Sequence, residues 1–128
     1  LHPNIAPYGE LFQTKDQDLI TFAIGSDAHF KKLCDYLQIK ILPENEKFST
    51  NQSRVINRTE LFHLLQDKIS HLSTNNILTT LIAENVPVGK VKNLQEVFAE
   101  EHVKTRILNE NIDGVTTQRV SSIAFKWK

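Results

Sequence analysis

The residue types that most often perform chemistry in proteins are sparse in this sequence and stand apart from one another. None of the five histidines has the i, i+4 spacing with an intervening Glu that a helical zinc site requires; they are His2, His29, His63, His71 and His102. His63 and His71 fall roughly on one side of a helix, where solvated surface histidines are the usual case. We therefore expect no metal site.

The single cysteine, Cys34, has no neighbouring His or second Cys. It lies on an apolar helical stripe with Phe30 and Leu37, which favours a packed, unreactive thiol over a nucleophile. One cysteine allows no intrachain disulfide and no thiolate cluster, so a reducing cytoplasm is the expected location.

The carboxylates and glycines, like the histidines, form no pattern typical of a catalytic or nucleotide-binding site. The adjacent pair Glu100-Glu101 and the residues Asp16 and Asp18 have the character of solvated surface groups. The four glycines are isolated, so neither a P-loop nor a dinucleotide-binding fingerprint is present. We assign no catalytic residue to this sequence.

Composition limits the class of protein. The length of 128 residues predicts one compact unit, and 40% hydrophobic residues are enough for a core without disulfides or metal. Fifteen Lys and Arg balance fifteen Asp and Glu without clustering, which argues against nucleic acid or anionic lipid as partner. No apolar stretch is long enough for a membrane helix. Because the first residue is Leu and no Met occurs, we expect a piece of a longer chain.

Periodicity and turn signals predict an α+β fold with short antiparallel strands at both ends of the chain and several intervening helices. Leu11-Phe12 and residues 19–24, separated by "TKDQD", indicate a hairpin, and a helix follows with Ser26 or Asp27 as its cap. Residues 38–52 are a connecting segment that Leu42 and Phe48 fix to the body.

Helical spacing continues through the centre of the chain. Residues 51–72 predict a short and a longer helix, the second capped by Thr59, and Ser73 or Thr74 caps a further helix that stops before Pro87. The apolar positions that follow this helical spacing are Val55, Ile56, Leu61, Phe62, Leu65, Ile69, Leu72, Ile77, Leu78, Leu81 and Ile82.

The last part of the chain combines a turn, a helix and a hairpin. Residues 86–91 predict a sharp turn, and Asn93 with Glu96 matches a capping box that would bury Leu94, Val97 and Phe98. Residues 106–125 predict a second hairpin around Asp113-Gly114, a preferred type I′ pair.

Five segments in this order resemble the class III (CaiB/BaiF) CoA-transferases, a family that also includes α-methylacyl-CoA racemases. They are "HPNIAPYG" with "F-x-T-K-D", "AIGSDAHFKKLCDYL", "FSTNQSRVINRTEL", "ENVPVGKV" and "LQEVFAEEHV". The resemblance implies that residues 1–9 are a linker from a large domain, absent from this chain, and that residues 10–128 are a single small domain.

The resemblance also implies how the intact enzyme works. Its members form interlocked homodimers and move CoA from an acyl-CoA to a carboxylic acid through a catalytic Asp in the large domain. No position here corresponds to that Asp, so the chain alone should be inactive. A coenzyme A thioester is the substrate of the parent enzyme, and this chain is expected to bind no cofactor by itself.

The small domain would contribute walls of the substrate site. The candidates are Tyr8 and Gly9 in the linker and the turn Pro87, Val88 and Gly89. The competing interpretation is that Tyr8 anchors the linker and that residues 87–89 only end a helix. Two positions depart from the family: Gln17 replaces a Gly of a mobile loop, and Lys90 replaces a common Pro.

Three other functions remain open. The parent enzyme can be a racemase instead of a transferase, since both would use groups of the large domain. A stand-alone noncatalytic module that binds a protein through its apolar surface is the second alternative. A small independent enzyme is the third, although no nucleophile with a base is visible.

Overall fold

The computed structural model describes residues 1–120, which divide into two compact units, Leu1–Val91 and one that begins at Lys92. The linker boundary expected after residue 9 falls inside the first strand. The assignment of residues 10–128 to one small domain stays a prediction.

The first unit contains a three-stranded antiparallel sheet. Its strands are β1 (Tyr8–Gln13), β2 (Leu19–Ala23) and β3 (Val88–Lys90), in the order β1-β2-β3. The predicted first hairpin is confirmed, with Phe12 paired to Ile20. The register shifts between Tyr8 and Leu11, a bulge that includes Gly9.

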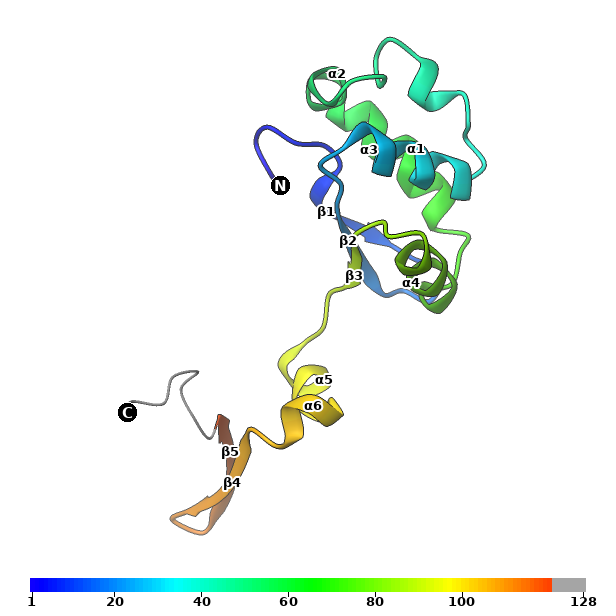
Figure 1. Ribbon diagram of the computed structural model, residues 1–128. Helices are drawn as coiled ribbons and strands as arrows, with labels where there is room; N and C mark the ends of the chain where they lie inside the picture. The colour runs from blue at the N-terminus through cyan, green and yellow to red at the C-terminus, as the bar shows by residue number, and fades with distance from the viewer. Residues whose placement is uncertain (121–128) are drawn as a thin grey trace, which may run out of the picture. The chain divides into compact units, whose positions relative to one another are not determined.

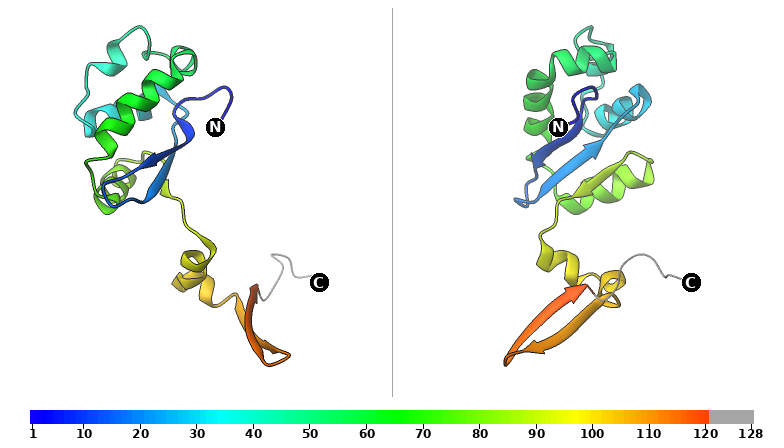
Figure 2. Two further views of the ribbon diagram at one scale, coloured as in Figure 1. Left: turned by 180° about the vertical axis from the view of Figure 1, so that it is seen from behind. Right: turned by 90° about the vertical axis from the view of Figure 1, so that its left-hand side faces the viewer.

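The helices of this unit are α1 (Asp27–Tyr36), α2 (Asn51–Ile56), α3 (Arg58–Ile69) and α4 (Thr74–Ala83), with a 3-10 turn, η1 (Leu42–Glu44). They pack on one side of the three strands (Figures 1 and 2). Inward side chains of the strands and of the helices form one core, which includes Phe12, Ile20, Phe22, Phe30, Leu33, Leu61, Leu65, Ile69, Ile77 and Leu81. The α+β class is thereby confirmed, with antiparallel strands and intervening helices.

Local signals located most helix ends correctly. Ser26 caps α1 by accepting a hydrogen bond from the N–H of His29 at 3.2 Å, and Ser73 caps α4. Leu42 and Phe48 are buried, as expected for the segment between α1 and α2.

Two expectations for this unit were wrong. Asn57 and not Thr59 precedes α3, because Asn57 alone separates the end of α2 from the start of α3. Of the apolar positions at helical spacing, Ile56 and Ile82 are 74% and 59% exposed, since both lie on the outer side of their helices. Residues 88–90 form strand β3 and not merely a turn, because their main chain pairs with β2.

The second unit contains α5 (Leu94–Ala99), α6 (Glu101–Lys104) and the hairpin β4 (Ile107–Ile112) and β5 (Val115–Val120). The capping box of Asn93 and Glu96 is present. Asp113 and Gly114 have φ values of 51° and 82°, as the type I′ turn requires. Residues 121–125 of the predicted hairpin lie outside the described residues.

The expected buried face of α5 is wrong. Leu94 is 73% exposed, and α5 has no buried residue, because the two short helices and the two-stranded hairpin described in this unit provide little surface to pack against. Among residues 1–120, no helix is long and apolar enough to cross a membrane.

Candidate functional site

A hollow of about 350 Å³ lies on the sheet of the first unit, where β2 runs between β1 and β3. Tyr8 pairs with Ala23 and Thr21 pairs with Gly89, so these four residues share one face of the sheet. Phe22 between them points to the opposite face, into the core. The hollow therefore lies on the face that the helices leave uncovered.

All five residues that the sequence suggested as lining residues meet at this hollow. Eight residues line it: Tyr8, Gly9, Thr21, Phe22, Ala23, Pro87, Val88 and Gly89. The linker end and the segment after α4 are almost eighty positions apart in the chain, and strand β2 brings them together by pairing with both. The structure thus places the candidates side by side, and their contact with substrate stays a prediction.

The chemistry of this hollow is that of a binding surface. Its walls are mainly apolar and none of its eight lining residues carries a charge. The hydroxyl oxygen of Thr21 is buried and has no hydrogen-bond partner within the described residues. A buried polar atom without a partner is costly. With its mainly apolar and uncharged lining, the hollow suits an apolar group.

The two glycines of the hollow differ in what they permit. Gly9 has a φ of 82°, and a Cβ there would lie 3.2 Å from the main-chain N of Leu1. At Gly89 a Cβ would meet no atom within 4 Å. Because Gly89 shares its face with Thr21, a side chain at position 89 would extend over the hollow without disturbing the fold.

A larger hollow of about 470 Å³ lies beside β1 and is lined by Leu1, Gly9, Glu10, Leu11, Arg58, Thr59 and Phe62. Arg58 Nη1 lies 3.1 Å from Glu10 Oε1, and Glu10 Oε2 is buried without a partner in the described part of the chain. The Arg58 guanidinium also binds main-chain carbonyls of the N-terminal segment. Since its charged groups serve this internal contact, we place the candidate site at the smaller hollow.

The carboxylates Asp16 and Asp18 have structural partners. Asp16 Oδ2 accepts a hydrogen bond from the N–H of Thr74 at 2.8 Å, and Asp18 Oδ1 lies 2.8 Å from Lys90 Nζ. Hydrogen bonds from Lys90 and Thr74 lower the pKa of Asp18. The hydroxyls of Thr14 and Thr74 are 2.8 Å apart and buried, which fastens the turn to α4.

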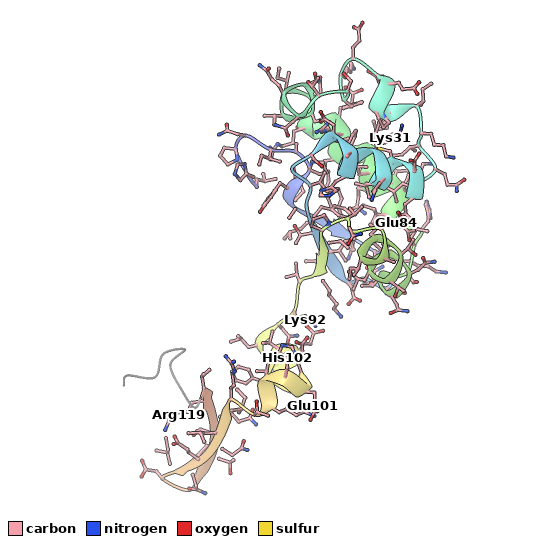
Figure 3. The ribbon with its side chains drawn as sticks, in the orientation of Figure 1. Lys31, Glu84, Lys92, Glu101, His102 and Arg119 are labelled. Carbon is pink, nitrogen blue, oxygen red and sulfur yellow. The ribbon has the colours of Figure 1, made fainter. Side chains whose placement is uncertain are left out.

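Cys34, Glu100 and Glu101, the other potentially reactive side chains, are either buried or paired with a neighbouring charge. Cys34 is fully buried, and desolvation raises its thiol pKa to about 12, so the thiol is protonated at neutral pH, as the sequence predicted. Glu100 pairs with Lys92 and His102, and Glu101 with Lys104. Figure 3 shows Glu101 and His102 on the α5–α6 segment, where they are exposed to solvent.

Sequence reasoning missed two contributors to this region. Thr21 was treated only as part of a strand, although the alternation of Ile20, Thr21 and Phe22 already placed it on the outer face. Arg54 and its neighbours on α2 bind the N-terminal segment that leads to Tyr8, and no local pattern announced their burial.

The chain is similar to known proteins over most of its length. The family model for CoA-transferase family III matches residues 1–128. The chain is 32% identical over 113 residues to the succinate–glutarate CoA-transferase of Agrobacterium fabrum, and 32% identical over 120 residues to the human succinyl-CoA:glutarate CoA-transferase. These alignments cover 88% and 94% of this chain, but only 28% and 27% of the respective relatives.

The fold of this chain is also similar to that of a solved structure. The structure of a CaiB/BaiF family protein from Brucella suis superposes with a TM-score of 0.81 at 32% identity. The superposition covers 98% of this chain and 32% of that protein. The chain thus spans about a third or less of the proteins that it matches.

Proposed function

Because the chain belongs to CoA-transferase family III, we propose that it is the small-domain part of an enzyme that transfers CoA from an acyl-CoA to a carboxylic acid. In this proposal residues 1–9 connect to a large domain, and both compact units belong to the small domain. The supporting observation is that residues 8–9 and 87–89, chosen from the family resemblance, line one hollow.

The role proposed for this chain is to form one wall of the acyl site. An apolar surface excludes the water that would hydrolyse a reactive acyl intermediate. The catalytic carboxylate comes from the rest of the enzyme, because the hollow itself holds no acid or base.

The substrates to test first follow from the relatives. The proteins from Agrobacterium and human carry succinate or succinyl-CoA and glutarate in their names. We therefore propose a dicarboxylic acyl group, with succinyl-CoA as donor and glutarate as acceptor. A second subunit and a cytoplasmic location belong to the same proposal, the latter supported by the single cysteine.

The experiment begins with the polypeptide that carries this sequence in its native host. Intact mass and peptide mass spectrometry with the peptide "HPNIAPYGELF" identify its full length. The purified polypeptide is then incubated with succinyl-CoA and glutarate, and glutaryl-CoA is measured, with the 128-residue chain as comparison. We expect transfer by a longer polypeptide and none by the chain alone. If only a 128-residue form exists, a binding module replaces the enzyme.

A further inference from the structure

Three side chains of α2 and α3 bind the main chain of the N-terminal segment, residues 2–6. Asn51 and Arg54 are three positions apart on α2, so they lie on one side of that helix, and Arg58 is the first residue of α3. We call these three residues the clamp.

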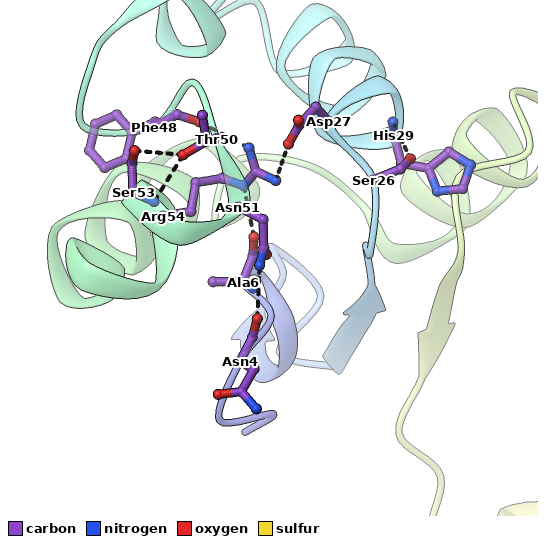
Figure 4. A network of polar contacts seen from close by, with 10 residues as sticks. All are labelled: Asn4, Ala6, Ser26, Asp27, His29, Phe48, Thr50, Asn51, Ser53 and Arg54. Atoms are coloured by element: carbon purple, nitrogen blue, oxygen red, sulfur yellow. Dashed lines mark hydrogen bonds and ion pairs between the residues drawn. The ribbon is translucent and has the colours of Figure 1, made fainter.

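The hydrogen bonds of the clamp to residues 2–6 all involve main-chain atoms of that segment. Asn51 Oδ1 accepts a hydrogen bond from the N–H of Ala6 at 3.2 Å, and its Nδ2 donates to the carbonyl of Asn4 at 2.8 Å. Arg54 Nε donates to the carbonyl of Ala6 at 2.9 Å (Figure 4). Arg58 Nη2 donates to the carbonyls of His2 and Ile5 at 2.6 and 2.7 Å.

Arg54 gives the clamp a fixed centre. Its side chain is fully buried, although a buried guanidinium is stable only when its charge and donors are satisfied. Nη1 donates to the carbonyl of Phe48 at 3.0 Å, Nη2 donates to Asp27 Oδ1 at 2.7 Å, and the group lies 4.4 Å from the ring centre of Phe30. These contacts leave the guanidinium a single position.

The clamped segment leads directly into the hollow. Only Pro7 separates Ala6 from Tyr8, and the Pro7 carbonyl accepts a hydrogen bond from the N–H of Ile24 at 3.3 Å. Tyr8 and Gly9 then form one wall of the hollow. Since one residue spans less than 4 Å, a displacement at Ala6 is transmitted to this wall.

We infer that Asn51, Arg54 and Arg58 are positioning residues of the proposed acyl site: by holding the main chain of residues 2–6, they fix where Tyr8 and Gly9 stand opposite Pro87–Gly89. This inference rests on the proposed function. The inference gives a role to residues 51–58, "NQSRVINR", which do not line the hollow themselves.

The test compares two asparagines that both bind main chain. Asn51→Ala removes the two bonds to residues 4 and 6, whereas Asn57→Ala removes bonds to the carbonyls of Lys47 and Ser53, away from the hollow. Asn51→Asp keeps the oxygen that accepts from Ala6. The readouts are the amide hydrogen exchange of Ile24 in the 128-residue chain and the KM and kcat of the longer enzyme.

We expect Asn51→Ala to speed exchange at Ile24 about fivefold, as the loss of one or two hydrogen bonds predicts, and to raise KM several-fold with little change in kcat. Asn51→Asp should restore most of the Ile24 protection, and Asn57→Ala should leave both readouts unchanged. Equal effects of the Asn51→Ala and Asn57→Ala variants would overturn the inference. If the unmodified longer enzyme transfers no CoA, the proposed function is wrong. The amide hydrogen exchange of Ile24 in the 128-residue chain then still shows whether the clamp holds the N-terminal segment.

Discussion

Gly9 combines two constraints at one residue of the proposed wall. Its positive φ is costly for any residue with a Cβ, and the main chain of Leu1 lies close to the place that a Cβ would occupy. We predict that Gly9→Ala lowers the free energy of unfolding by about 1–2 kcal/mol, measured by urea denaturation.

The matched control for this substitution is Gly25→Ala. Gly25 has no positive φ, and a Cβ there would meet no atom within 4 Å. This variant should be as stable as the unmodified chain or slightly more so. Equal destabilisation by both substitutions would show that the conformation of Gly9 is not what the structure depicts.

Residue roles were predictable only where a local pattern marks them. Cys34 belonged to an apolar stripe, and its burial followed from that stripe. Arg54 gave no such signal, because a charged residue on a polar helix is normally solvated. Its burial depends on partners 48 and 27 positions earlier in the chain, Ala6 and Asp27, which only the tertiary fold brings near.

At the scale of elements, the turn between β1 and β2 is fastened to α4 and β3. Asp18 binds Lys90, and hydrogen bonds from Lys90 and Thr74 lower its pKa. A lowered pKa in the folded chain means that the ionised carboxylate stabilises it above the unfolded value of about 3.9, and that this stabilisation is lost as the pH falls through the lower, folded value.

We therefore predict that Asp18→Asn lowers stability at pH 7 and makes stability depend less on pH below about 4. Urea denaturation of both proteins at pH 7, 5 and 3 measures this. Asp35→Asn, on the exposed side of α1, is the control for the loss of one surface carboxylate and should lower the stability at pH 7 less than Asp18→Asn does. Identical curves for the Asp18→Asn variant and the unmodified chain would contradict the account of the turn.

Elements with their own caps and stripes were predictable, and the third strand was not. α1 and α4 have serine caps and apolar faces, so sequence alone located them. β3 has three residues and contains Gly89, too short for any periodicity. It exists because β2 offers a free edge, which is a property of the tertiary structure.

At the scale of the molecule, the buried core found among residues 1–120 belongs to the first compact unit. Every core residue from Phe12 to Val86 lies within residues 1–91. We predict that a chain of residues 1–91 folds alone and unfolds cooperatively, with a urea midpoint close to that of the 128-residue chain. A chain of residues 1–91 without cooperative unfolding would show that residues from 92 onward supply part of its stability.

The hollow is likewise a property of the molecule, because it needs three strands and the clamped N-terminal segment. Family resemblance selected five of its eight lining residues, but the pairing that joins them was not visible in the sequence. Their joint position supports a shared role in substrate binding.

The most direct test of that role is a substitution in the longer enzyme that places a side chain in the hollow. In Gly89→Val the new side chain enters open space on the face of Thr21, so the fold should persist. We predict that the kcat/KM for CoA transfer from succinyl-CoA to glutarate falls roughly 10- to 100-fold, as misplaced substrate does elsewhere. Gly25→Val should stay within about twofold of the unmodified enzyme, because its position is outside the hollow. Unchanged kcat/KM in a folded Gly89→Val enzyme would contradict the claim that this chain lines the acyl site.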